Sequence, residues 1–351
     1  MAVRAGEDVD LDVLNRFLAA SASGFGRIVG IDQFPGGFSN LTYLLKAEDG
    51  AEYVLRRPPR GVEKGPAHDM AREYRILGAL EGAGVAAPRP IALCEDPGIL
   101  GAPFYIMERV TGLILRGNLK VAPSTGVMER LSENFVETLV QIHQVNASDP
   151  AVAALGRGDG YVVRQVSGWT SRWAKSKTDV VPAMDEVATW LDTMQPKDCG
   201  TCLVHNDYKY DNLVLNANDP AEIVAVLDWE LATLGDPLMD VGTSLGYWVE
   251  AGDHPAFQAL GLGATALSGN FTRQELWDRY LLRTGRETVS PVFYYVFGVF
   301  KIAVIAQQIY ARYQKGLSTD ARFARLGEAV KLMAGVAQVA GEYDSITGVH
   351  G

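Results

Sequence analysis

The sequence predicts an α+β protein with two lobes, a small front lobe and a larger back lobe. The front lobe, residues 1–110, contains five runs of strand-forming residues and an internal helix, which indicates a five-stranded antiparallel sheet. After Thr111-Gly112 apolar residues recur at helical spacing, so residues 111–351 should form a mainly helical lobe. Ligand pockets favour junctions between domains, so we expect the chemistry to lie between the two lobes.

The front lobe opens with an amphipathic helix at 9–21, where apolar residues follow helical spacing. Asp49-Gly50 lies between two of the expected strands. Because this dipeptide is a strong hairpin signal, we expect it to form the turn that joins them. A second helix is expected at about 68–80, closed by two glycines. The five expected strands cover residues 27–34, 40–47, 52–57, about 90–94 and about 104–110.

The back lobe is predicted to be helical apart from a β-rich island at 203–228. Its most apolar stretch, 291–306, is interrupted by Lys301 and is short for a bilayer span. We therefore expect a buried helix there and no membrane partner. The expected helices cover residues 124–145, about 167–177, 182–194, 237–249, 272–283, 291–314 and 319–342.

Composition restricts the partners and the compartment. Apolar residues make up 48% of the 351 residues and charged residues 21%, as in ordinary globular proteins. The net charge of −10 argues against a non-specific nucleic-acid or membrane-surface partner. Three cysteines are too few for a disulfide framework, and acidic residues stand where a signal peptide would be apolar. We therefore expect a cytoplasmic protein.

The candidate catalytic residues lie in the segment 203–212, LVHNDYKYDN, and at the end of the apolar run that follows it. Phosphoryl transfer needs a carboxylate that orients the attacking hydroxyl and oxygen ligands that hold Mg²⁺ on the phosphates. Asp207, in a tight loop after a strand, suits the first role. Asn212 and Asp228 suit the second, and Lys209 is placed to stabilise charge on the transferred group.

This pattern resembles the catalytic and metal-binding segments of protein kinases: His-x-Asp-x-Lys-x-x-Asn, a hairpin, then an aspartate at a strand end. LDWE in place of DFG, followed by LGDPLMD, is similar to the aminoglycoside phosphotransferase and choline kinase group. More narrowly, the stretch resembles the kinase-like domain associated with acyl-CoA dehydrogenases. The resemblance covers about residues 30–320. It implies a protein-kinase-like fold, ATP and Mg²⁺ as cofactors, and Asp240 as a brace for the catalytic loop.

In the front lobe, Gly36, Gly37 and Ser39 are candidates for binding phosphate through backbone amides, since they lie in a loop between two strands. The loop lacks the full G-x-G-x-x-G pattern, and a plain Gly-Gly hairpin explains it equally well.

Four further positions follow from the resemblance. Arg56 stands where kinases carry a phosphate-contacting lysine, and Glu73 stands where its ion-pair partner belongs. Arginine binds phosphate in a planar, bidentate manner but is bulkier than lysine. Backbone groups of Glu108 and Val110 correspond to the segment that receives adenine. A solvent-exposed helical charge is the alternative role for Glu73.

Other interpretations of the catalytic segment stay open. In a plain hairpin, Asp207 and Asn212 would serve turns, and His205 would be buried. A metallohydrolase would use His205, Asp207 and Asp228 to bind a transition metal. A catalytically silent kinase fold would bind a nucleotide or metabolite, and Arg56 in the lysine position supports it.

Cys199-x-x-Cys202-x-x-His205 has a spacing that suits zinc. Cys202, however, lies in an apolar run, where cysteine packs as a small hydrophobic residue. The sequence contains no second Cys/His pair that would complete such a site.

The phosphate acceptor is a small hydroxylated molecule of open identity. The narrower resemblance implies a hydroxyacyl group, such as a hydroxyacyl-CoA, and a functional link to an acyl-CoA dehydrogenase. The wider one implies an aminoglycoside, an amino alcohol or a sugar. A CoA ester needs a basic entrance, whereas the acidic balance favours a cationic acceptor. Candidates for a basic entrance are Arg116, Lys120, Arg164 and Arg172.

Overall fold

The computed structural model describes residues 3–4, 6–21, 24–34, 40–59, 68–116, 122–287, 289–318 and 320–348. The chain divides into two compact units. The first comprises residues 1–112, 148–155 and 224–232, and the second comprises the remainder. The first unit thus takes in two segments that follow the predicted boundary at residue 110. Each unit is described by itself below.

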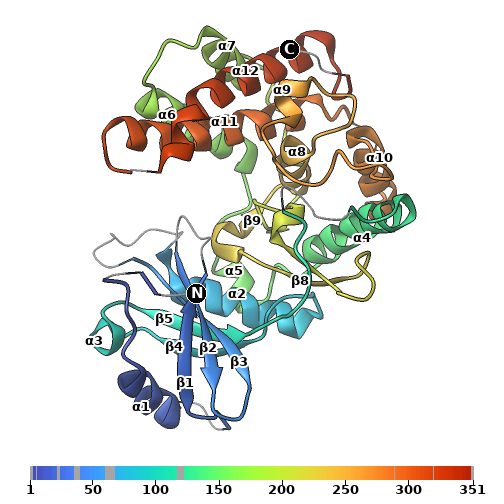
Figure 1. The fold of residues 1–351 in the computed structure, drawn as a ribbon. Helices are drawn as coiled ribbons and strands as arrows, with labels where there is room; N and C mark the ends of the chain where they lie inside the picture. The colour runs from blue at the N-terminus through green and yellow to red at the C-terminus, as the bar shows by residue number, and fades with distance from the viewer. Residues whose placement is uncertain are drawn as a thin grey trace. The chain divides into compact units, whose positions relative to one another are not determined.

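A five-stranded antiparallel sheet forms the centre of the first unit, in the order β1-β2-β3-β5-β4 (Figure 1). The predicted sheet is therefore confirmed, with ends that differ by a few residues. The hairpin between β2 and β3 turns at Gly50, whose φ of 85° suits glycine. The strands are β1 (Ile28–Gln33), β2 (Leu41–Ala47), β3 (Glu52–Arg57), β4 (Pro90–Cys94) and β5 (Phe104–Glu108).

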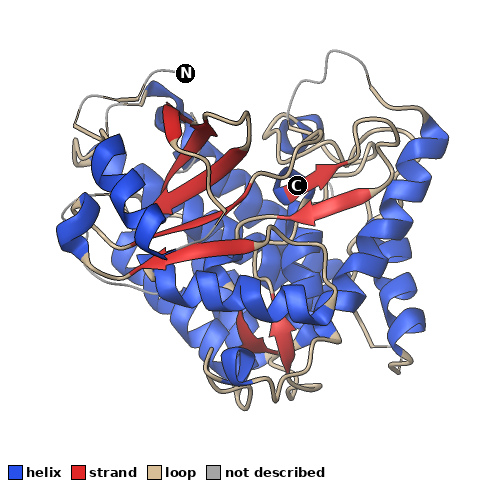
Figure 2. Cartoon of the chain, turned by 90° about the horizontal axis from the view of Figure 1, so that it is seen from below, coloured by secondary structure: helices blue, strands red, loops and turns tan. Residues whose placement is uncertain are grey.

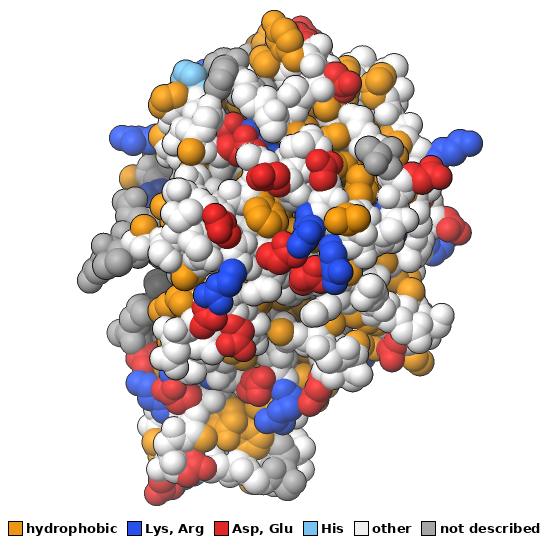
Figure 3. Space-filling view, turned by 90° about the vertical axis from the view of Figure 1, so that its right-hand side faces the viewer, with side chains coloured by type: hydrophobic (Ala, Val, Ile, Leu, Met, Phe, Trp, Pro, Cys, Tyr) orange, Lys and Arg blue, Asp and Glu red, His pale blue; other side chains and the backbone are white. Residues whose placement is uncertain are grey.

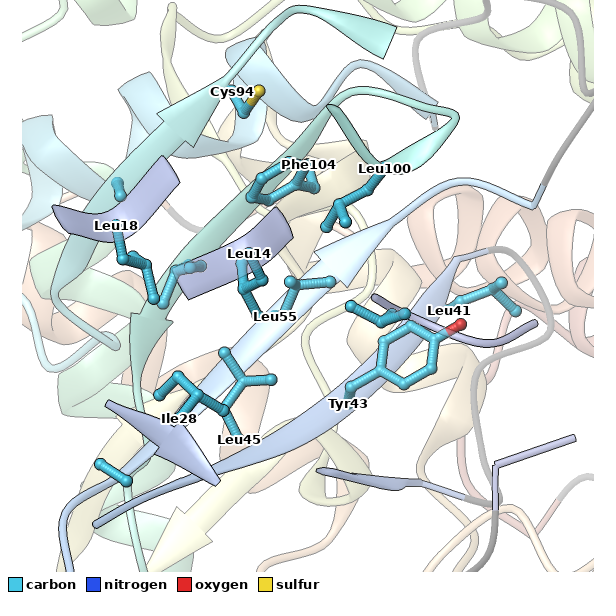
Figure 4. Packing of buried hydrophobic residues seen from close by; sticks show 14 residues of the cluster. Leu14, Leu18, Ile28, Leu41, Tyr43, Leu45, Leu55, Cys94, Leu100 and Phe104 are labelled. Atoms are coloured by element: carbon cyan, nitrogen blue, oxygen red, sulfur yellow. The ribbon is translucent and has the colours of Figure 1, made fainter. Parts of the chain in front are cut away.

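One face of this sheet packs against the opening helix, α1 (Leu11–Ser21). Leu14 and Leu18 of α1 belong to one buried cluster with alternate residues of β2, among them Tyr43 and Leu45 (Figure 4). Alternation with a period of two places these side chains on one side of the strand. The buried apolar area of this cluster stabilises the sheet.

The remaining elements of the first unit include α2, which contacts β4 and β5. Asp69 caps its first turn by accepting a hydrogen bond from the Arg72 amide, and Gly84, at φ 71°, ends it. Neighbouring residues of a strand point to opposite faces of the sheet. Arg56 accordingly lies beside Glu73 of α2, whereas Arg57 on the other face binds carbonyl oxygens of the opening segment. These elements are α2 (Met70–Ala83), α3 (Pro97–Leu100), α5 (Pro150–Ala153), β8 (Ile223–Val226, from Val224 on) and the short helix η3 (Trp229–Leu231).

The second unit is mainly helical, as predicted, and its few strands are short (Figure 2). β6 (Cys202–Val204) pairs antiparallel with β9 (Thr233–Gly235). Its other elements are α4 (Thr125–His143), α6 (Tyr161–Ser176), α7 (Pro182–Thr193), η2 (Tyr210–Asn212), β7 (Leu213–Leu215), α8 (Pro237–Tyr247), α9 (Pro255–Gln258), α10 (Arg273–Thr284), α11 (Val292–Gln314), η4 (Ala321–Arg325) and α12 (Leu326–Tyr343).

Helix α11 is the centre of the second unit and packs against α6, α7, α8 and α12. It is long and apolar enough to cross a membrane by length and composition, but 83% of its most apolar window is buried within the protein. Its glycine Gly298 lies so close to α8 that an added Cβ would stand 2.1 Å from the carbonyl oxygen of Gly242. The two backbones therefore touch at this crossing.

Helix α6 begins at Tyr161, six residues before the predicted start at residue 167. Its first residues, Tyr-Val-Val, are β-branched or aromatic and are poor helix formers. The carboxylate of Asp198 accepts hydrogen bonds from the backbone amides of Tyr161 and Val162, both at 2.9 Å. A side chain 37 residues away thus caps this helix, which explains why local sequence did not reveal its start.

Candidate active site

The loop that follows β6 is held in place by Asp240 of α8. Its carboxylate accepts hydrogen bonds from the backbone amides of His205 and Asn206, both at 2.7 Å. Nε2 of His143 lies 3.1 Å from the same carboxylate. Burial alone would raise the pKa of Asp240, but the hydrogen bond to His143, the charge of His143 and the interactions with His205 together outweigh it and lower that pKa. Asp240 is therefore an ionised, fully buried brace for this loop.

Three predicted site residues come together in this loop: Asp207, Lys209 and Asn212. Nζ of Lys209 lies 2.9 Å from both carboxylate oxygens of Asp207. Nδ2 of Asn212 donates to the carbonyl oxygen and to Oδ2 of Asp207, each at 2.9 Å. The Asp207 carboxylate is thus oriented by two neighbours and sits beside a positive charge.

The orientation of the Asn212 amide matters for metal binding. Because Nδ2 faces Asp207, the oxygen Oδ1 lies on the other side of the amide group. Amide and carboxylate oxygens are hard ligands of the kind that Mg²⁺ prefers. The donor chemistry of Asn212 and of Asp228 therefore fits a magnesium ion.

In the first unit, Arg56 of β3 is surrounded by three carboxylates. Its Nη2 lies 2.6 Å from Oδ1 of Asp228 and 2.7 Å from Oε2 of Glu230, and its Nε lies 3.4 Å from Oε2 of Glu73. Arg56 and Glu73 are nearly inaccessible to solvent, whereas the Asp228 side chain is 34% exposed. The Arg56 cluster, defined as these four residues, has one positive charge for three acidic groups.

Burial, and then the surplus of acidic groups, shift the pKa values within the Arg56 cluster. Burial raises the pKa of Glu73, although Arg56 opposes that effect. Burial, followed by repulsion from Asp228, raises the pKa of Glu230 to about 7. Burial also disfavours the charge on Arg56, but the carboxylates around it outweigh that effect and its pKa lies well above its usual value. Glu230 was not among the predicted site residues. The sequence signal that could have identified it is its position at the end of the motif LDWE, two residues after Asp228.

Backbone strain coincides with the predicted site. Among the described residues, three that are not glycine have positive φ, and two of them are Asn206 at 67° and Asp228 at 69°. The first directly precedes Asp207, and the second is itself a predicted metal ligand. This conformation is unfavourable for residues with a Cβ and is typical of functional positions.

The remaining predicted nucleotide contacts are less well defined. Gly36, Gly37 and Ser39 lie outside the described residues. Glu108 is the last residue of β5, and its backbone amide donates to the carbonyl oxygen of Arg89 at 2.9 Å. Any base contact of Glu108 would therefore use its carbonyl oxygen. Val110 follows the end of the strand and is partly buried.

The Cys-x-x-Cys-x-x-His pattern does not converge in the described structure. Sγ of Cys199 donates to Asp236 at 3.3 Å, whereas Sγ of Cys202 contacts the carbonyl oxygen of Gly235 at 3.8 Å. Burial, and then the Asp236 carboxylate, raise the pKa of Cys199 to about 12, which disfavours the thiolate that zinc needs. Among the described residues, no three His, Cys, Asp or Glu side chains are arranged to hold a metal.

Comparison with known sequences identifies a matching family and similar proteins. A model of a phosphotransferase enzyme family matches residues 30–280. Mouse acyl-CoA dehydrogenase family member 10 is 34% identical over 310 residues, which make up 87% of this chain and 28% of that protein. The chain thus spans less than a third of the length of this relative.

Comparison with solved structures agrees. A structure from Ralstonia eutropha, provisionally described as an aminoglycoside phosphotransferase, is 31% identical with a TM-score of 0.82, and the match covers 96% of this chain and 99% of that one. Spectinomycin phosphotransferase in complex with ADP and spectinomycin is 13% identical with a TM-score of 0.62, and the match covers 94% and 99%. The predicted protein-kinase-like α+β fold and the predicted family resemblance are confirmed.

Proposed function

Because the chain belongs to the phosphotransferase enzyme family, we propose that it transfers the terminal phosphoryl group of Mg-ATP to a hydroxyl group of a small molecule. The observation that carries this proposal is the loop in which Asp207, Lys209 and Asn212 are joined by hydrogen bonds. The side chains of Lys209 and Asn212 both donate to the carboxylate of Asp207. A hairpin that served only as a turn would not require this arrangement.

Each residue of the loop has a role in this reaction. Asp207 orients the acceptor hydroxyl and takes its proton as the oxygen–phosphorus bond forms and the bond to ADP breaks. Lys209 balances negative charge on the transferred group. Asn212 and Asp228 would hold Mg²⁺, which neutralises charge on the phosphates when bound. Arg56, in the lysine position, would contact the phosphates and keep its charge at any physiological pH.

The test is Mg²⁺-dependent conversion of ATP to ADP in the presence of hydroxylated acceptors. The Asp207→Asn variant should bind ATP nearly as well as wild type but turn over about 10²- to 10⁴-fold more slowly, because the hydroxyl loses its base. Asp219→Asn is the matched control, since Asp219 is an exposed carboxylate paired with Arg130. Full activity of Asp207→Asn would refute the assignment.

For the acceptor, we propose a hydroxylated acyl group, in the form of a CoA ester. The relative named above is an acyl-CoA dehydrogenase family member, and this chain matches a part of it. Of the predicted basic residues, Arg116 and Arg164 donate hydrogen bonds to carbonyl oxygens. Arg172 lies over the ring of Trp169 at 4.6 Å. Lys120 lies outside the described residues.

Net charge does not contradict an anionic acceptor. On the face drawn in Figure 3, acidic and basic side chains are interspersed, so the charge of −10 does not predict the sign of one pocket. The alternative acceptor is an aminoglycoside or amino alcohol, as the description of the Ralstonia structure suggests.

Thermal shift in the presence of Mg-ADP separates these acceptors, because stabilisation follows ligand concentration over Kd. We expect a hydroxyacyl-CoA to raise the Tm more than an aminoglycoside, and Arg172→Ala to reduce only the first shift. A larger shift with the aminoglycoside, unchanged in Arg172→Ala, would favour the alternative. Binding of nucleotide with no turnover of any acceptor would favour the catalytically silent fold.

A further inference from the structure

We propose that Lys301 of α11 is a positioning residue for the catalytic loop, because its ammonium group fixes the peptide bond between Asn206 and Asp207. What the loop does rests on the proposed function, whereas the contact itself does not. No sequence motif pointed to this lysine as part of the site.

The peptide bond in question is held at both ends. Nζ of Lys301 donates to the carbonyl oxygen of Asn206 at 2.7 Å. The amide of Asp207, on the other side of the same bond, donates to Nδ1 of His205 at 3.2 Å. The plane of this peptide therefore has little freedom to rotate, and Asp207 is attached directly to it.

Asn206 is also held by two other helices. Its backbone amide donates to Asp240 of α8, and its side-chain oxygen accepts a hydrogen bond from the hydroxyl of Tyr161 of α6 at 2.9 Å. Three helices thus bind its amide, its carbonyl and its side chain. A left-handed asparagine persists only where its surroundings over-determine it, and these contacts do so.

Lys301 is an unexpected residue at its position. It is 2% exposed and lies one turn after Gly298, in the part of α11 that crosses α8. A buried ammonium group costs desolvation energy, and a hydrophobic residue of similar volume often packs as well or better. The lysine is explained by what it binds, because an apolar side chain would leave the Asn206 carbonyl without this donor.

The charged groups that face Lys301 act in both directions. Asp207 and Asp240 favour its protonated form, whereas Lys209 and Arg172 oppose it. Burial is the largest effect and lowers the pKa of Lys301 to about 8. Its Nζ also lies 5.7 Å from the centre of the Trp169 ring. The ammonium form is therefore present at pH 7 and is lost within an accessible pH range.

The sequence allows this one peptide bond to be observed directly. Asn-Asp occurs at Asn206-Asp207 and at Asn218-Asp219 and nowhere else. A protein labelled with ¹³C-carbonyl asparagine and ¹⁵N-aspartate should therefore give two coupled NMR signals. The signal of Asn206-Asp207 should titrate with a midpoint near that of Lys301, which is about 8, whereas that of Asn218-Asp219 should not.

Lys301→Met tests the contact, since it keeps the length of the side chain and removes the donor. Gln307→Met is the matched control, because Gln307 is a buried polar residue of the same helix that binds Ser176 and Thr178. Hydrogen exchange at the Asp207 amide should accelerate by about 10-fold or more in Lys301→Met and not in Gln307→Met.

A catalytic readout completes the test, with water as the acceptor and Mg-ATP as the substrate. Lys301→Met should lower kcat for ATP hydrolysis by about 10-fold or more at an unchanged KM for ATP, because Asp207 is mispositioned while the nucleotide contacts remain. The wild-type rate should fall as the pH rises through about 8, and this limb should be missing from the variant.

The outcomes separate the two proposals. Unchanged exchange at Asp207 in Lys301→Met, or an Asn206-Asp207 signal that does not titrate, would overturn the role of Lys301 whatever the activity. Should Lys301→Met fail to fold, the titration of the wild-type signal decides alone. Altered exchange with no ATP turnover by the wild-type protein would support the contact and refute the proposed function.

Discussion

Arg56 in the first unit, whose side chain is 11% exposed, and Arg273 in the second, which is fully buried, each lie among acidic side chains but are bound very differently. Arg273 is 0% exposed and uses every guanidinium nitrogen: Nε binds a carbonyl oxygen at 2.5 Å, and Nη1 and Nη2 bind Asp253 at 2.8 and 2.6 Å. Arg56 binds two carboxylates through Nη2 alone, and its Nε makes no hydrogen bond to the described residues.

Under the proposed function, this difference separates an arginine that serves the fold from one that serves the site. Arg273 ties Asp253 to the carbonyl oxygen of Ile346 and also lies 3.3 Å from Glu250, whose pKa is raised by burial. Arg56 lies among three carboxylates, and burial, followed by repulsion from Asp228, raises the pKa of one of them, Glu230, to about 7. Surplus charge with perturbed pKa values is typical of functional sites, where a further cation completes the balance.

The largest expected effect on stability is that of Arg273→Met. Removing this cation leaves Asp253 buried without its partner, which should lower the free energy of unfolding by about 3–5 kcal/mol. Urea denaturation measures the loss. ATP affinity should stay within a few-fold of wild type. If Arg273→Met were as stable as wild type, Arg273 would not have the structural role assigned to it here.

Arg56→Met should have the opposite profile. Affinity for Mg-ATP, measured by calorimetry, should fall by about 10-fold or more, because a bidentate phosphate contact is lost. The loss of stability should be smaller than in Arg273→Met, since Asp228 can reach solvent and Glu230 can take up a proton. Unchanged nucleotide binding would show that Arg56 is structural as well.

Glu230→Gln sharpens the comparison through pH. The folded-state pKa of Glu230 is about 7, above the ordinary value of 4.5 for a glutamate, so the folded protein holds this proton more tightly than the unfolded chain. The contribution of Glu230 to stability is therefore lost as the pH rises from about 4.5 to about 7. Glutamine does not lose this contribution, because it does not ionise. The unfolding free energy of Glu230→Gln minus that of wild type should therefore be about 1–3 kcal/mol larger at pH 8 than at pH 5.

The smallest effect is expected for a third arginine pair, at the surface. Arg130 binds Asp219 through two hydrogen bonds, at 2.9 and 3.0 Å, and both side chains are about half exposed. Solvent screens such pairs, so Arg130→Ala should leave the Tm and ATP affinity within error of wild type. A clear loss of stability would show that bidentate geometry, more than burial, sets the value of these pairs.

Much of the second-unit site could be predicted because its contacts are local. Asp207, Lys209 and Asn212 lie within six positions, so a tight loop brings them together whatever surrounds it. The pairing of Arg56 with Glu73 followed from the family resemblance, whereas Glu230 was missed. Its carboxylate reaches Arg56 from 174 positions along the chain, and no local pattern encodes that distance.

The sequence by itself determined the fold class, the strand alternation that separates Arg56 from Arg57, and the chemistry of the loop after β6. Each depends on periodicity or on neighbours a few residues apart, which local sterics and side-chain chemistry impose. Only the tertiary structure decided the cap of α6 by Asp198 and the contact of Lys301 with Asn206, 95 positions away. These exist because packed helices bring distant polar groups into a dry interior, where each must find a partner.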